Sequence, residues 1–304
     1  SEFAETQAQI SPDGRWLVYV SDESGSDEVY AQALINAREV QRLTASDPYL
    51  INKNAIARIW EAYLFSRLTD LYGDIPYSQA LQGATSLNFS PAYDRQQTIY
   101  KNLLTALKNA SNDLDASKAV YPGTADPIYN GSLTKWKQFA NSLRLRLALR
   151  MSAADPASAQ AEIASLQGQS FISANSESAI FPYNGDIRNP LFDLLNSGQS
   201  GGRTYPSKFL IDHLKATNDP RIKVFAQYTL ESTIIGIPDY DGVPNLVPAG
   251  SSIWSNYNSD ASDVSKMGTW FLKQDAPGMI MSYAEVCFLK AEAALKGWYS
   301  GDAQ

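Results

Sequence analysis

Histidine and cysteine are nearly absent from this sequence, which has one of each among 304 residues, His213 and Cys287. A metal site made of imidazole and thiolate ligands needs several such residues at fixed spacings, so that kind of site is excluded. A disulfide within the chain is excluded as well. Cys287 lies in an apolar stretch with helical spacing, where we expect a buried thiol. We therefore expect neither a metal nor a cofactor.

The sequence also lacks an excess of basic residues and any long apolar run. Its 25 Lys and Arg residues are outnumbered by 32 Asp and Glu residues, which gives a net charge of -7. Binding to nucleic acid phosphates needs a basic face, so a nucleic-acid partner is not expected. No run of about 18 apolar residues is present, so no transmembrane helix is expected. Hydrophobic residues make up 44% of the chain, which is typical of a globular protein with a sizeable core.

Apolar residues recur with the period of an α-helix over most of the chain, which predicts a mainly helical fold. Long irregular segments interrupt this pattern at about 168–206 and 229–278. In the last predicted helix, the apolar stripe predicted to face inward consists of Ala284, Cys287, Phe288, Ala291 and Leu295. Helices are expected at about 56–71, 95–114, 132–151, 157–166, 208–214 and 282–296.

The N-terminal segment has a different pattern. Residues 10–32 contain β-rich runs at 16–20 and 28–32, with turn sequences at Pro12–Gly14 and at Ser24–Gly25. This pattern predicts a short β-hairpin, which must pack on other structure because two strands alone are marginally stable. We therefore expect an N-terminal hairpin segment at 1–45 and a helical domain at 46–304.

Catalytic motifs were considered and rejected. Gly198–Gly202 fits the pattern G-x-S-x-G, but it lies in a polar glycine-rich loop, whereas a nucleophile elbow needs a strand before it and a helix after it. Carboxylates at 239–242 and 260–263 lack the spacing of a calcium-binding EF-hand loop, so solvated turns are the stronger interpretation. The pattern does not indicate an enzyme.

Aromatic side chains in the irregular segments point instead to ligand binding. The flat C–H faces of sugar rings stack on Tyr and Trp, while amide and carboxylate groups bind the hydroxyls. The alternative is that half or more of these rings only pin long loops to the helical scaffold. The candidate ligand-binding residues in the loops are Tyr183, Asn184, Tyr205, Tyr240, Trp254 and Tyr257.

Four stretches in order resemble one known family. Arg58–Leu81 is similar to the D-x-Y-G-D-I-P-Y-x-x-A motif of the SusD/RagB family, which includes starch-utilisation proteins. Ser90–Ala110 and Asp126–Ser152 match the same family, as does Asn218–Arg221 paired with Met281–Trp298. Four ordered matches over about 240 residues are far more specific than one short motif.

This resemblance implies a SusD-like helical fold with tetratricopeptide-like helix pairs and a glycan site formed by loops, with Tyr77 of the matched motif as a further candidate. It also implies a nutrient-binding lipoprotein on the outer face of the bacterial outer membrane. Such a protein works with a SusC-like TonB-dependent transporter and is not an enzyme. The lipid anchor and the C-terminal part of the domain are expected to lie outside this chain. Residues 10–32 are instead similar to one repeat of a TolB-type β-propeller, and a single repeat cannot close a propeller.

Two other functions are compatible with the same resemblance. The wider family includes oligopeptide-binding proteins, and a long apolar groove in place of an aromatic surface would favour that function. A tetratricopeptide-like interaction module without a ligand of its own is the second alternative.

Overall fold

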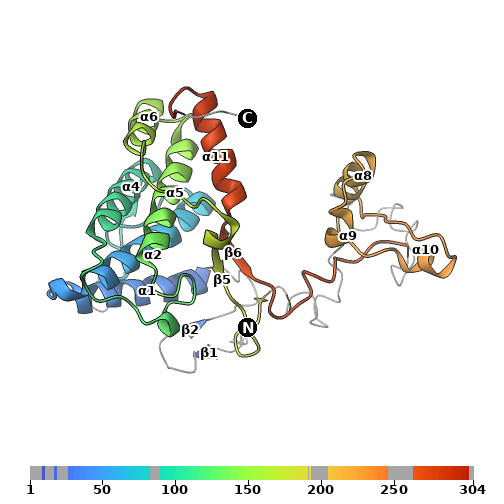
Figure 1. Ribbon diagram of the computed structural model, residues 1–304, viewed down its shortest axis with the longest axis horizontal. Helices are drawn as coiled ribbons and strands as arrows, with labels where there is room; N and C mark the ends of the chain where they lie inside the picture. The colour runs from blue at the N-terminus through green and yellow to red at the C-terminus, as the bar shows by residue number, and fades with distance from the viewer. Residues whose placement is uncertain are drawn as a thin grey trace. The chain divides into compact units, whose positions relative to one another are not determined.

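Figure 1 shows the computed structural model of the chain, which describes residues 9–10, 17–18, 27–82, 90–190, 192, 205–245 and 263–300. Helix is the main structure, as the sequence predicts. The chain forms two compact units. Unit 1 consists of Ser1–Phe181 and Met279–Gln304, and unit 2 consists of Pro182–Gly278. The sequence predicts a domain boundary at residue 45, which is not the division between these two units. That boundary stays a prediction.

The N-terminal hairpin forms with a different strand pair from the one predicted. β1 (Gln9–Ile10) pairs in antiparallel fashion with β2 (Leu17–Val18). The strand predicted at 28–32 is wrong, because those residues begin the helix α1 (Asp27–Thr44). Further along α1, Leu34 and Ala37 are buried on one face, so packing on a helical layer overrides the local β-propensity. The predicted turns lie outside the described residues.

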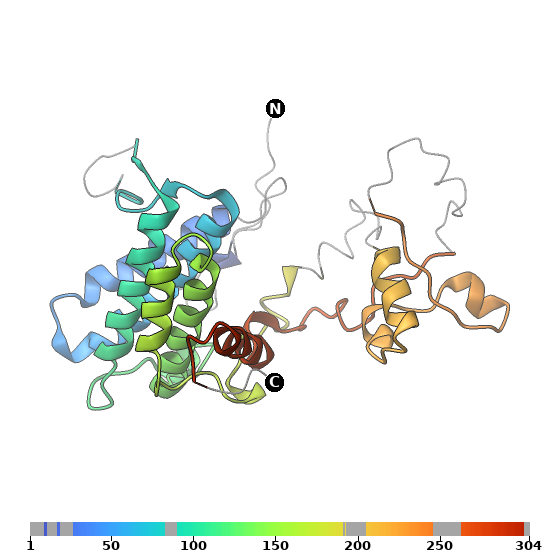
Figure 2. The same cartoon turned by 90° about the horizontal axis from the view of Figure 1, so that it is seen from above.

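Unit 1 is a layer of helices in which each packs on the next. α1 packs on α2, α2 on α4, α4 on α5, and α5 on both α6 and α11 (Figures 1 and 2). Side-chain caps begin several of them: Ser132 accepts from the Lys135 amide at the start of α5, and Ser282 accepts from Glu285 at the start of α11. The remaining helices of unit 1 are α2 (Ile51–Tyr72), α4 (Gln96–Asp113), α5 (Leu133–Met151), α6 (Pro156–Ser165) and α11 (Tyr283–Leu295), with short 3₁₀ helices at Pro48–Leu50, Gly123–Ala125 and Asn175–Glu177.

α5 is the central helix of unit 1 and is buried on all sides. The sequence predicts surface arginines on this helix, with one or two ion pairs. The ion pairs are confirmed, but Arg144 and Arg146 are buried, with exposed fractions of 3% and 8%. Arg144 pairs with Glu162 of α6 at 2.6 Å, and Arg146 pairs with Glu285 of α11 at 2.6 Å. A buried guanidinium needs such a partner, because desolvation of an unpaired charge is costly.

The motif at the end of α2 joins three helices. Gly73, with φ of 73°, ends α2 in a conformation that favours glycine. β3 (Ile75–Pro76) then pairs with β4 (Tyr93–Asp94). Asp70 binds both the Tyr100 hydroxyl of α4 and Arg150 of α5. The matched sequence therefore has a structural role in positioning α2, α4 and α5.

α11 buries a different face from the one that the apolar stripe predicts. Val286 and Ala293 are buried, whereas Phe288 and Leu295 are 77% and 80% exposed. Cys287 is exposed as well, so the expectation of a buried thiol is wrong. The helix is apolar on more than one side, and the position of α5 selects the buried side.

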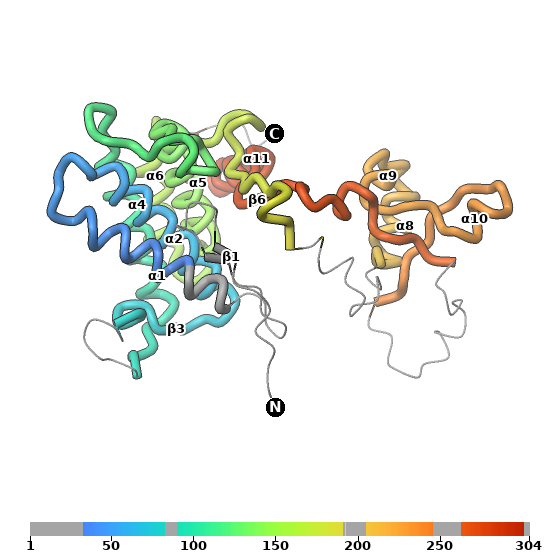
Figure 3. The backbone as a smooth tube through the Cα atoms, turned by 90° about the horizontal axis from the view of Figure 1, so that it is seen from below, coloured from blue at the N-terminus to red at the C-terminus, as the bar shows by residue number. Residues whose placement is uncertain are grey.

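Unit 2 has its own small core. Ile211, Leu214, Ile222 and Ala226 are buried together, with Tyr240 packed against them. Two short pieces of strand, β5 (Ala179–Phe181) and β6 (Gly278–Met281), pair where the chain leaves and re-enters unit 1. Figure 3 follows the backbone through the same elements. The helices of unit 2 are α8 (Lys208–Ala216), α9 (Ile222–Phe225) and α10 (Leu230–Ile234).

Candidate functional site

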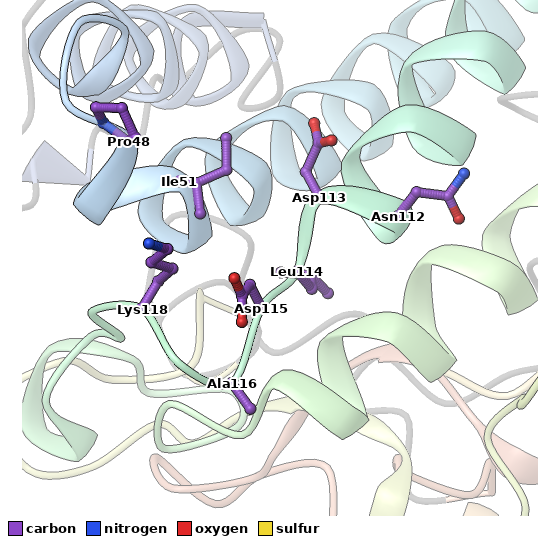
Figure 4. A pocket seen from close by; sticks show the side chains of 8 residues that line it. All are labelled: Pro48, Ile51, Asn112, Asp113, Leu114, Asp115, Ala116 and Lys118. Atoms are coloured by element: carbon purple, nitrogen blue, oxygen red, sulfur yellow. The ribbon is translucent and has the colours of Figure 1, made fainter.

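The described part of unit 1 has a groove of about 560 Å³ between the start of α2 and the end of α4 (Figure 4). Two of its acidic residues already bind residues beside the groove: the Asp115 carbonyl accepts from the Asn52 side-chain amide at 2.7 Å, and Asp113 pairs with Arg58. Hydrogen bonds from the Ser117 amide and hydroxyl hold the pKa of Asp115 below its usual value. No aromatic ring contributes to this lining, so the groove has no stacking surface for a sugar. The lining residues are Pro48, Ile51, Asn112, Asp113, Leu114, Asp115, Ala116 and Lys118.

Tyr77 lies in unit 1 and is half-buried. Its ring packs edge-on against Phe65, with 4.8 Å between the ring centroids, and its backbone amide donates to Asp94 at 3.1 Å. Burial raises the pKa of the Tyr77 hydroxyl. These contacts assign Tyr77 to the junction between β3 and the core of unit 1.

All six of the other predicted residues belong to unit 2, and four of them are among the described residues. Tyr183 is half-buried, and its burial raises its pKa. The Asn184 side-chain oxygen accepts from the amides of Asp186 and Ile187, both at 2.8 Å, so this residue closes a turn of its own loop. Trp254 and Tyr257 lie outside the described residues.

Backbone hydrogen bonds bring the segments of Tyr205 and Tyr240 close to each other. The Val243 amide donates to the carbonyl of Pro206 at 3.0 Å, and the Lys208 amide donates to the carbonyl of Val243 at 2.7 Å. Tyr205 directly precedes this bridge, and Tyr240 lies three residues before Val243. Both rings are half-buried.

The Tyr240 ring packs against the ring of Tyr228, a residue that is not among the predicted ones. The two ring centroids are 4.6 Å apart, with an angle of 34° between the planes. Tyr228 is 45% exposed, so one member of the pair is open to solvent. Burial, and then a hydrogen bond with Tyr228, raise the pKa of Tyr240 to about 12. Tyr228 is followed at once by a five-residue helix, and no periodic pattern in the sequence marks its ring as exposed.

The two tyrosines stand at the ends of one ordered loop, which we call the 228–240 loop. Its ends are joined by a hydrogen bond from the Thr229 amide to the Asp239 carbonyl at 3.0 Å. Inside the loop, the Ser232 hydroxyl oxygen accepts from the Asp239 amide at 3.0 Å. Lys215 of α8 pairs with the Asp239 carboxylate at 2.8 Å, which lowers the pKa of Asp239. The loop and its tyrosine pair are therefore held in one arrangement.

A neighbouring segment adds a second exposed aromatic group. The Gln227 amide donates to the Lys266 carbonyl at 2.9 Å, which places residues 263–268 beside the start of the loop. Trp270 follows that segment, is 43% exposed and packs edge-on against Phe271 at 5.0 Å. Phe271 in turn stacks with Phe225 at 5.9 Å. Unit 2 thus carries exposed Tyr and Trp rings on a hydrogen-bonded framework.

The described residues include neither a metal-binding cluster nor a membrane-spanning helix. Within them, no group of three or more His, Cys, Asp and Glu side chains is placed to hold a metal ion. The helices that the structure describes include none with the length and apolar character needed to cross a bilayer. The arrangement of unit 2 is suited to contact with a flat, partly apolar ligand.

Comparison with known proteins agrees with the resemblance found in the sequence motifs. The model of a SusD-like family, described as starch-binding and associating with the outer membrane, matches residues 9–304. The match includes the N-terminal segment that the sequence analysis sets apart from this family. A comparison with curated proteins finds no match.

Three solved structures illustrate the similarity. A chitin-binding protein is 33% identical, with a TM-score of 0.77, over 90% of this chain and 58% of its own. A SusD homologue from Bacteroides uniformis is 28% identical, with a TM-score of 0.76, over 95% of this chain and 59% of its own. A chitin-binding SusD homologue from Flavobacterium johnsoniae is 27% identical, with a TM-score of 0.75, over 90% of this chain and 54% of its own. This chain thus spans less than two thirds of the length of each.

Proposed function

Because the chain belongs to the SusD-like family, we propose that it binds an oligosaccharide at the surface of unit 2 and releases it unchanged, without catalysis. The observation that carries this proposal is the pair of Tyr228 and Tyr240 rings, packed against each other at the ends of an ordered loop. An exposed ring held in place offers a sugar a stacking surface, and little side-chain entropy is lost when the ligand binds.

The relatives suggest which glycans to try first. Two solved relatives are named as chitin-binding, so oligomers of N-acetylglucosamine are the first candidates. The family description names starch, so α-linked glucose oligomers are the second. Tyr183, Asn184, Tyr205, Trp254 and Tyr257 stay candidate contacts within unit 2, as does Tyr77 in unit 1.

The proposed setting is the outer face of the bacterial outer membrane, with a lipid anchor in the full-length protein. A SusC-like TonB-dependent transporter is the proposed partner, which takes up the captured nutrient. The support for this setting is the family description, which associates these proteins with the outer membrane.

The experiment is a glycan-array screen of the chain, followed by titration calorimetry with the best ligand. We expect Tyr228→Ala to weaken binding about tenfold, because it removes one exposed stacking ring, and Tyr228→Phe to bind nearly as well as the wild type. Tyr49→Ala is the matched control, since Tyr49 is a 60% exposed tyrosine in unit 1.

Two results would contradict this proposal. Equal losses in Tyr228→Ala and Tyr49→Ala would show that the Tyr228–Tyr240 pair does not contact the glycan. Absence of binding to every glycan, together with saturable binding to a peptide library, would favour the oligopeptide-binding alternative.

A further inference from the structure

The 228–240 loop displays four aliphatic side chains to solvent. Leu230 is 55% exposed, and the three isoleucines are more exposed still: Ile234 at 74%, Ile235 at 64% and Ile237 at 69%. A single exposed aliphatic residue on a protein surface needs no explanation. Four of them lie within eight residues, and a concentration of exposed apolar side chains commonly marks an interaction site.

The backbone that carries these side chains is firmly held. The Ile237 amide donates to the carbonyl of Ser232 at 3.0 Å, and the Thr229 hydroxyl caps the start of α10 by accepting from the Ser232 amide at 3.1 Å. Gly236, with φ of 76°, makes the turn after α10. The aliphatic side chains therefore belong to an ordered loop, and the ribbon of α10 and this loop lies apart from α8 and α9 within unit 2 (Figures 1 and 2).

The aliphatic residues lie within a short reach of the tyrosine pair. Leu230 is two residues from Tyr228, and Ile237 is three residues from Tyr240. An extended chain spans at most about 3.6 Å per residue, so the Cα separations are at most about 7 Å and about 11 Å. These separations are short enough for one oligosaccharide bound at the tyrosines to span the distance to Leu230 and Ile237.

The chemistry of sugar substituents decides what these residues recognise. Hydroxyl groups gain nothing from contact with an isoleucine, because such contact costs them their hydration. The acetamido group of an N-acetylated sugar ends in a methyl group, and its burial against an aliphatic surface is favourable. We propose that Leu230, Ile234, Ile235 and Ile237 make the site selective for N-acetylated glycans by binding their acetyl methyl groups. This inference rests on the proposed function.

The test compares two tetrasaccharides with the same β-1,4-linked backbone, the N-acetylglucosamine tetramer and the glucose tetramer. Each buried methyl group strengthens binding about fourfold, so contact with two of them gives the wild type a preference of roughly 15-fold for the first ligand. In the double variant Ile234→Ser, Ile237→Ser we expect this preference to fall to about one, with unchanged affinity for the glucose tetramer. Val224→Ser, which alters a 46% exposed aliphatic residue of α9, is the control and keeps the preference.

The outcomes separate this inference from the function on which it rests. If both tetramers bind equally well, or if the double variant keeps the wild-type preference, glycan binding stands and the acetyl-methyl contact is wrong. If neither tetramer nor any other glycan binds, both proposals are overturned. A loss of affinity for both tetramers in the double variant, with Val224→Ser unaffected, would assign the isoleucines to general ring contact and overturn the selectivity.

Discussion

At Asp126 a single carboxylate accepts hydrogen bonds from four donors. Three are backbone amides, those of Ile128 and Tyr129 at 3.1 Å and of Gly131 at 2.8 Å, and the fourth is the indole N–H of Trp136 at 2.7 Å. Asp126 is only 4% exposed, so these donors have little access to water. The carboxylate therefore orders the turn that leads into the central helix α5.

Replacement of Asp126 by alanine should destabilise the protein by about 3 kcal/mol, because it leaves several buried donors without an acceptor. The measurement is urea unfolding followed by tryptophan fluorescence, with Trp136 as a local reporter. Asp186→Ala, at an exposed position in unit 2, is the control and should change stability by about 0.5 kcal/mol or less. Equal effects in the two variants would contradict the role assigned to Asp126.

Tyr77 shows that a sequence match does not specify the contacts of a single side chain. The motif that contains Tyr77 identifies the family, and it made the ring a candidate for ligand contact. The structure places the ring against Phe65, a residue twelve positions earlier in the chain. Ring–ring packing of this kind depends on how α2 and β3 meet, and residue spacing does not specify it.

α11 shows how a helix with apolar residues on two sides misleads a prediction from periodicity. The stripe from Ala284 to Leu295 has good helical spacing, as does the set that contains Val286 and Ala293. The second set is buried, because α5 lies on that side and Arg146 binds Glu285 beside it. The start, the end and the type of this element were predictable, but its buried face was not.

This assignment of faces can be tested by two substitutions on the same helix. Val286→Ala should cost about 1–3 kcal/mol of unfolding free energy, because Val286 is fully buried. Phe288→Ala should change it by about 0.5 kcal/mol or less, because Phe288 is 77% exposed. Chemical denaturation of both variants measures the difference, and the reverse order would mean that the stripe read from the sequence is the buried one.

Carboxylates in both units contribute to the loss of stability at acid pH. A hydrogen bond from Lys101 lowers the pKa of Asp155 in unit 1 to about 2, and a hydrogen bond from Arg221 lowers that of Asp219 in unit 2 to about 2. Their ordinary value is 3.8, so both groups are ionised more readily in the folded state. The stability they contribute is present above pH 4 and is lost as the pH falls through 2.

Tyrosines set the alkaline limit. Burial raises the pKa of Tyr121 in unit 1 to about 12, and burial together with the hydrogen bond between Tyr240 and Tyr228 raises that of Tyr240 in unit 2 to about 12. Their ordinary value is 10.0, so the folded state favours the neutral phenol, and its contribution is lost as the pH rises from 10 to 12. Thermal unfolding midpoints should therefore be nearly constant between pH 5 and 9 and fall on both sides. A midpoint that rose between pH 10 and 12 would contradict this account.

The division into two units belongs to the scale of the whole molecule. The sequence predicts a single helical domain after residue 45, interrupted by long irregular segments. Much of the second half of the chain instead forms a unit with a core of four buried residues on α8, α9 and the segment after α9. Ile211 and Leu214 are part of a predicted helix. Their partners Ile222 and Ala226 follow a turn, and the sequence around them is too short to show a helical period.

The sequence by itself determined the family, the helical class and the approximate limits of α2, α4, α5, α6, α8 and α11, because helical periodicity and capping residues are local properties. It also predicted candidate contacts in the aromatic-rich loops that lie in unit 2 and at Tyr77 in unit 1, and these stay predictions. Only the tertiary structure decided which face of α11 is buried, that α1 replaces a strand, and that Tyr228 partners Tyr240. These features depend on contacts between residues far apart in the chain or in different elements, and such contacts have no period that a single sequence displays.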